Sequence, residues 1–71
     1  MKLYIPVTVD APDGATHYAG EPPGDMTFYK VKDFGVAGEH WFIWKDIEKE
    51  WAFISHRKPH WISTIPAWWR K

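Results

Sequence analysis

The chain has 71 residues, no cysteine, and nine basic side chains balanced by nine acidic ones. This length predicts a single small domain over residues 1–71 and excludes a two-domain enzyme. The charge balance argues against a uniformly basic nucleic-acid binder, and the lack of cysteine removes disulfide bonds and thiolate zinc sites. No apolar run approaches the roughly 20 residues of a membrane span, and we expect a cytoplasmic location.

Aromatic content is high, with six Trp, three Tyr and four Phe. Each aromatic side chain can bury about 150–250 Å², so these residues can build a core that needs no disulfide or metal. Charge is uneven along the chain: residues 1–50 hold five basic and nine acidic side chains, whereas residues 51–71 hold four basic and no acidic ones. Four of the six Trp also lie in residues 51–71. The carboxyl-terminal third is therefore basic and aromatic.

Strands and turns alternate in the first part of the chain. Residues 2–9 are rich in β-branched and aromatic side chains, but Pro6 does not fit a central strand, so they predict an edge strand or an extended arm. A turn at 12–14, marked by Asp-Gly, precedes a short strand at 15–19. Two prolines between two glycines predict a second turn at 20–25.

The clearest strand covers residues 26–33. Its side chains alternate, with Tyr29 and Val31 on one face and Phe28 and Lys30 on the other. This alternation predicts a strand that is covered on at least one face.

Residues 39–56 allow two interpretations. As a helix, they carry an apolar stripe at spacings of three and four residues. As a hairpin, aromatic runs at 40–45 and 50–55 flank a charged loop. The hairpin is favoured, because the apolar residues gather at the two ends of the segment and Phe42 and Phe53 fall off the helical stripe.

Together these elements predict a mainly β fold, a small antiparallel β-meander of three to four strands. An amino-terminal edge strand or arm precedes it, and a short turn or helical segment follows it. Within that segment, residues 61–65 are either a helical turn or a last short strand. We expect the arm at 2–9 and the segment 60–69 to cover one face of the sheet.

Aromatic motifs are distributed over about residues 12–65, namely Pro12-Asp-Gly-Ala-Thr-His-Tyr18, Phe28-Tyr-Lys30, Trp41-x-x-Trp44, Trp51 and Pro59-x-Trp61. In their spacing, these motifs resemble small Trp-rich orphan proteins of tailed phages and prophages. The resemblance implies a compact antiparallel meander, a phage or prophage origin and a location in the cytoplasm of the host cell. The family brings no known active site, so the resemblance implies no functional residue.

Nothing in the sequence forms a catalytic or cofactor constellation. His56 and His60 have the spacing of a helical zinc pair, but Pro59 between them breaks such a helix. His17 is expected to be a half-buried histidine with satisfied hydrogen bonds. The acids of residues 46–50 alternate with lysines and predict a solvated loop. We therefore expect no metal, no cofactor and no enzymatic activity.

The strongest functional signal is the interleaving of aromatic and basic residues near the carboxyl end. It predicts a non-enzymatic interaction module that binds a host protein; the alternative is binding of single-stranded nucleic acid. In an extended tail, adjacent residues point to opposite sides, which predicts Trp68 inward and Trp69 more exposed. The candidate contact residues are Arg57, Lys58, Trp61, Trp69, Arg70 and Lys71.

Overall fold

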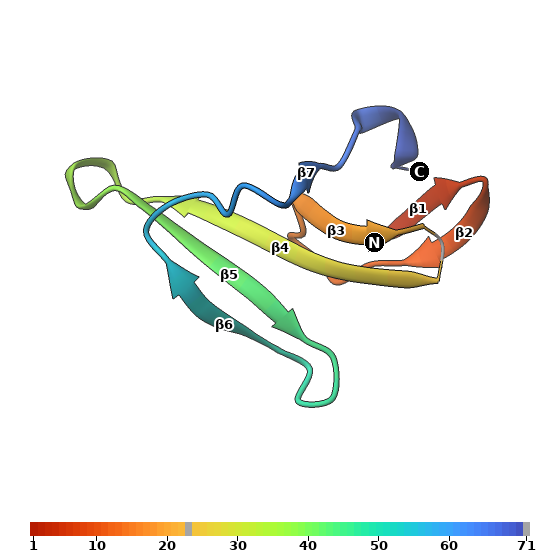
Figure 1. Cartoon of the computed structure of the whole chain (residues 1–71), viewed down its shortest axis with the longest axis horizontal. Helices are drawn as coiled ribbons and strands as arrows, with labels where there is room; N and C mark the ends of the chain where they lie inside the picture. Colours follow the sequence, from red (N-terminus) through yellow and green to blue (C-terminus); the bar gives the residue numbers. More distant parts are fainter. Residues whose placement is uncertain (23, 71) are drawn as a thin grey trace.

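A computed structural model describes residues 1–22 and 24–70, which form two antiparallel sheets (Figure 1). One is a hairpin of β1 and β2, and the other has five strands in the order β6-β5-β4-β3-β7. The described residues contain no α-helix, and hence no helix that could cross a membrane. The expected mainly β, antiparallel fold is confirmed. The elements are β1 (Lys2–Ile5), β2 (Val7–Asp10), β3 (His17–Glu21), β4 (Asp25–Asp33), β5 (Glu39–Lys45), β6 (Glu50–Ser55), β7 (Ser63–Thr64) and the 3₁₀ helices η1 (Gly35–Ala37) and η2 (Ala67–Trp69).

Residues 39–56 form the β5–β6 hairpin rather than a helix. Trp44 lies opposite Trp51, and Lys45 lies opposite Glu50. The charged loop closes with a hydrogen bond of 2.7 Å from the Lys49 amide to the Lys45 carbonyl oxygen. The favoured hairpin interpretation is therefore confirmed. In the hairpin, the two apolar runs lie on neighbouring strands, and their aromatic side chains pack against each other.

The β3–β4 turn is tighter than the predicted turn at 20–25. Gly20 pairs with Met26 and Glu21 pairs with Asp25, so both strands continue into the predicted turn. Gly20 adopts a φ of 95°, a conformation that a residue without a Cβ reaches at no steric cost. The glycine thus extends the ladder, where the sequence analysis expected it to end the strand.

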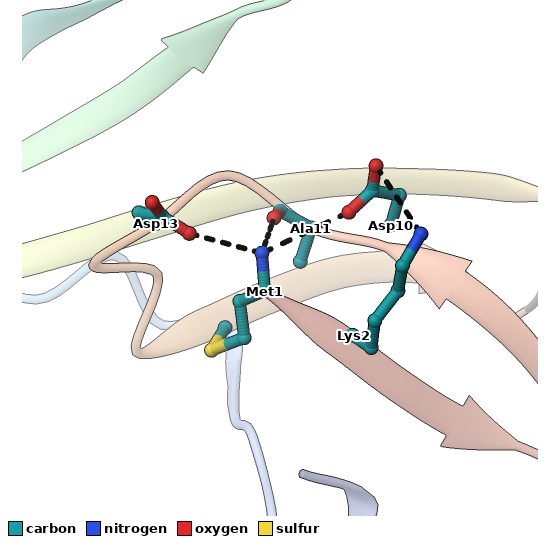
Figure 2. A network of polar contacts seen from close by, with 5 residues as sticks. All are labelled: Met1, Lys2, Asp10, Ala11 and Asp13. Carbon is teal, nitrogen blue, oxygen red and sulfur yellow. Dashed lines mark hydrogen bonds and ion pairs between the residues drawn. The ribbon is translucent and has the colours of Figure 1, made fainter. Parts of the chain in front are cut away.

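Residues 2–9 form a complete hairpin and not a single arm. Ile5 pairs with Val7 on either side of Pro6, so the proline occupies the bend, where its missing N–H costs no ladder hydrogen bond. At the open end, the Met1 ammonium donates hydrogen bonds of 2.9 Å to the Ala11 carbonyl oxygen and 2.9 Å to Asp13 Oδ1 (Figure 2). These contacts fasten the start of β1 to the segment that follows β2.

The core is divided between the two faces of the large sheet. On the first face, the β1–β2 hairpin and the end of the chain pack over β3 and β4 (Figure 1). On the second face, the segment that leaves β6 for β7 brings Ile62 against Tyr29 and Trp41. The prediction that residues 2–9 and 60–69 cover one face is therefore correct only in part. The β1–β2 hairpin, Ile65 and Trp69 lie on the first face, but Ile62 lies on the second, and β7 is an edge strand of the sheet. The first-face cluster consists of Leu3, Ile5, Ala11, Ala15, Phe28, Ile65 and Trp69.

The predicted orientations of Trp68 and Trp69 are wrong. Trp69 is 7% exposed and its ring lies 5.0 Å from that of Tyr18, whereas Trp68 is 76% exposed. The prediction assumed an extended tail, but residues 67–69 turn as η2, with a hydrogen bond of 3.1 Å from the Trp69 amide to the Pro66 carbonyl oxygen. This turn rotates Trp69 toward β1, where Arg70 forms a β-bridge with Leu3.

Candidate binding surface

The predicted carboxyl-terminal contact residues do not gather into one patch. Arg57 and Lys58 are exposed in the loop after β6, and Trp61 is 61% exposed with its indole N–H 3.4 Å from Tyr29 Oη. Trp69 belongs to the core, so its ring is not available to a partner. Arg70 lies beside β1, on the bridge to Leu3. Lys71 lies outside the described residues.

A different aromatic surface lies on the β5–β6 hairpin. Residues opposite each other in an antiparallel ladder point to the same face, and the register places Phe42 opposite both Lys30 and Phe53. The rings of Phe42 and Phe53 lie 6.0 Å apart, and those of Trp44 and Trp51 lie 5.2 Å apart. We call this surface the aromatic face, and it consists of Lys30, Lys32, His40, Phe42, Trp44, Trp51, Phe53 and His56.

The two ends of the aromatic face differ in how far they are covered. Trp44 and Trp51 pack against the first-face core beside the amino-terminal hairpin. Phe53 is 49% exposed, and it lies among the rings of His40 at 5.5 Å and His56 at 5.0 Å. The end of the face that is farther from the hairpin is therefore open to a ligand.

His40 is central to the open end. Its ring lies 4.6 Å from that of His56 and 4.6 Å from that of Phe34, which is itself 52% exposed. Within the described structure, His40 Nδ1 is buried and has no hydrogen-bond partner. The open end thus combines exposed rings with an unsatisfied polar atom beneath them.

Lysines of β4 border the aromatic rings. Lys30 Nζ lies 5.4 Å from the centroid of Phe42 and 4.8 Å from that of Trp51, within cation–π range. Burial, and secondarily the charge of Lys32, lowers the pKa of the Lys30 ammonium. Lys32 is exposed and pairs with His40 in the ladder.

The charge of the aromatic face follows from strand alternation. In β4, β5 and β6, the acidic residues Asp25, Asp33, Glu39 and Glu50 alternate to the other face of the sheet. The aromatic face therefore carries lysines, and no position of these three strands that points to it is acidic.

A groove of about 350 Å³ adjoins the covered end of the aromatic face, between the amino-terminal segment and the β5–β6 loop. Trp44 and Phe28 form its apolar wall, and Asp10 and Asp46 bring carboxylates to its rim. A hydrogen bond from the Lys49 ammonium, at 3.2 Å, holds the pKa of Asp46 below its ordinary value. Asp46 consequently stays ionised and is poorly suited to exchange protons near neutral pH.

His17 lies on the second face and is engaged at both ring nitrogens. Thr16 Oγ1 lies 2.8 Å from Nδ1, and Thr64 Oγ1 lies 3.3 Å from Nε2. The edge of Trp41 approaches the ring at 4.8 Å. Burial, followed by the charge of Lys58, lowers the pKa of His17. This confirms the expected half-buried histidine with satisfied hydrogen bonds.

His56 and His60 contact different neighbours. The ring of His56 packs on Phe53 and His40, whereas that of His60 packs on the adjacent Trp61 at 5.3 Å. Among residues 1–22 and 24–70, no cluster of three or more His, Asp or Glu has the arrangement of a metal site. His56 is exposed, and its ring packs at the edge of the aromatic face, a contact that the sequence analysis did not predict.

Comparison of the chain with protein-family models, curated proteins and solved structures gives no significant match. The aromatic face therefore has to be interpreted from its own geometry. Sequence reasoning placed Phe42 and Phe53 in the correct strands but did not identify them as a site. The available signal was the register of two hairpins. Pairing about the charged loop sets Phe42 opposite Phe53, and the pairing of β4 with β5 sets Lys30 opposite Phe42.

Proposed function

We propose that this domain is a non-enzymatic interaction module that holds single-stranded nucleic acid on its aromatic face. The observation that carries the proposal is the exposed ring of Phe53 on a face that also bears Lys30 and Lys32. Exposed aromatic rings stack unpaired bases, at about 1–3 kcal/mol per base, and ammonium groups neutralise the neighbouring phosphates. The balanced charge of the whole chain does not oppose this, because the positive charge is local to the face.

The geometry suggests how a strand would lie. The Lys30 ammonium already covers Phe42 and Trp51, so we expect the first base to stack on Phe53. Lys32, exposed on β4 beside His40, is then placed to meet the adjoining phosphate. At the opposite end, Trp44 and Trp51 pack against the first-face core, which favours a path confined to the open end.

A fluorescence titration with an oligothymidine of about ten nucleotides tests the proposal, because Trp44 and Trp51 lie on the same face and report on binding. Phe53→Ala is expected to weaken binding about 5- to 150-fold, the equivalent of one stacked base. Lys32→Gln is expected to lower the slope of log affinity against log salt by about 0.7. The matched control is Lys2→Gln, which removes an exposed lysine from the amino-terminal hairpin. Absence of quenching would contradict nucleic-acid binding, and equal affinities of Phe53→Ala and the native chain would contradict base stacking on the aromatic face.

A host protein is the second candidate partner. Its support is the exposure of Trp61 (61%) and Trp68 (76%), with Arg57 in the same loop as Trp61, since Trp and Arg dominate protein–protein hot spots. If oligonucleotide binding is absent, the test is capture of a host protein. A single host protein that the native chain captures, and that Trp61→Ala or Trp68→Ala does not, would favour this candidate. Origin in a tailed phage or prophage stays part of the proposal and is supported by the sequence resemblance alone.

A further inference from the structure

We propose that a second copy of this chain pairs with the free edge of β6, joining two five-stranded sheets across a two-fold axis. β6 pairs with β5 on one side, and among the described residues no strand pairs with its other side. This inference concerns the assembly of the free protein and is independent of the nucleic-acid proposal.

The edge of β6 lacks most of the features that protect sheet edges. Its sequence from Glu50 to Ser55 contains neither proline nor lysine, and Phe53 and Ile54 are 49% and 38% exposed. The opposite edge, β7, has only two residues, which is itself a protective feature. One protection is present on β6: the register shifts opposite Trp41 and Phe42, which leaves Ile54 as a bulge. The regular edge therefore covers residues 50–53.

This short edge favours one antiparallel register. Opposite residues in a ladder share a face, so Trp51 and Phe53 can oppose each other but neither can oppose Ala52. Centring the pair on Ala52 places the two small alanines at the axis and Trp51 of each copy against Phe53 of the other. A two-fold axis perpendicular to the sheet reverses the strand and keeps its face, so both aromatic faces lie on the same side of the joined sheet.

Charge complementarity identifies a second copy as the occupant. Residues 46–50, before and at the start of β6, hold three acidic side chains and Lys49, which pairs with Asp46, so this end is acidic; Arg57 and Lys58 follow the other end of β6. Antiparallel self-pairing brings the acidic end of each strand to the basic end of its partner, twice in the symmetric pair. A parallel partner would instead place like charges together.

A cysteine at the two-fold axis tests the register directly, because the native chain contains none. Opposite Cα atoms in an antiparallel pair lie about 4.5–5.5 Å apart, within the range that a disulfide spans. Under mild oxidation, Ala52→Cys is expected to form a disulfide-linked dimer, while the matched control Thr64→Cys on the exposed edge β7 stays monomeric. Equal cross-linking of the two variants would overturn the proposal.

A charge swap provides a measurement that a folding defect does not imitate. Sedimentation equilibrium should give a mass rising from 8.4 kDa toward twice that value with concentration. Arg57→Glu and Glu50→Arg are each expected to weaken the dimer about two- to fivefold, and the double variant to restore it. A single-chain mass at every concentration up to about the millimolar range, or a double variant weaker than both single ones, would overturn the pairing.

Discussion

Trp68 and Trp69 are adjacent in the chain but differ in exposure, at 76% and 7%. Trp69→Ala removes a ring from the first-face core, and we expect it to lower the free energy of unfolding by about 3–5 kcal/mol. Trp68→Ala removes an exposed ring and should change it by no more than about 0.5 kcal/mol. Urea denaturation measures the free energy of unfolding of both variants. Similar losses of that free energy would contradict the difference in burial between Trp69 and Trp68.

His17 should make stability depend on pH. Its pKa lies below the ordinary value of 6.5 in the folded chain, mainly because of burial. As the pH falls below that value, the unfolded chain binds a proton that the folded chain resists, so the free energy of unfolding decreases; above it, both states are neutral and no contribution remains. His17→Gln should therefore lose less stability than the native chain between about pH 7.5 and 5.5. Thermal melts at both pH values, with His60→Gln as the exposed control, measure this, and identical pH slopes for His17→Gln and the native chain would contradict it.

At the scale of elements, the β3–β4 hairpin depends on Gly20. Its φ of 95° is unfavourable for any residue with a side chain, and a Cβ there would collide with the Asp25 carbonyl oxygen. The left-handed conformation alone costs about 1–2 kcal/mol, so Gly20→Ala should destabilise by at least that amount. Gly24→Ala is the matched control, because a Cβ there would contact no other atom and the φ of Gly24 is not in the positive range. Chemical denaturation of both variants is the measurement, and equal stabilities would show that the turn relaxes.

Local sequence patterns predicted the positions of the strands better than the pairing between them. Alternation in residues 26–33 and the paired aromatic runs on either side of the charged loop correspond to β4, β5 and β6 within a residue or so of their ends. The amino-terminal hairpin was missed because Pro6 suits a bend as well as an edge strand. Residues 61–65 were left open between a helical turn and a last short strand, because the two residues of β7 carry no periodicity. The place of β7 beside β3 depends on the long connection from β6.

The candidate site was hidden for a related reason. Residues 51–71 suggested one basic, aromatic patch, but the chain crosses the second face and then turns at η2, which separates Arg57 from Arg70. The aromatic face instead combines Lys30 of β4 with Phe53 of β6. These residues are distant in sequence, and they become neighbours only once the register of both hairpins is known.

At the scale of the whole molecule, two cores share one sheet. Phe28 and Tyr29 are neighbours in β4, yet Phe28 belongs to the first-face cluster and Tyr29 to the second. A strand that loses its packing on one face also loses the backbone alignment that supports the other face. We therefore expect the faces to unfold together, in a single transition.

Leu3→Ala and Ile62→Ala test this coupling, because Leu3 (0% exposed) belongs to the first-face cluster and Ile62 (4% exposed) to the second. Each variant should lose about 2–5 kcal/mol, a large share of the roughly 4–11 kcal/mol expected for a chain of this size. In each variant, the urea midpoint followed by Trp fluorescence and the midpoint followed by far-ultraviolet circular dichroism should decrease by the same amount. Separate transitions for the two probes would show that the two faces unfold independently, one stabilised by the β1–β2 hairpin and the other by the segment between β6 and β7.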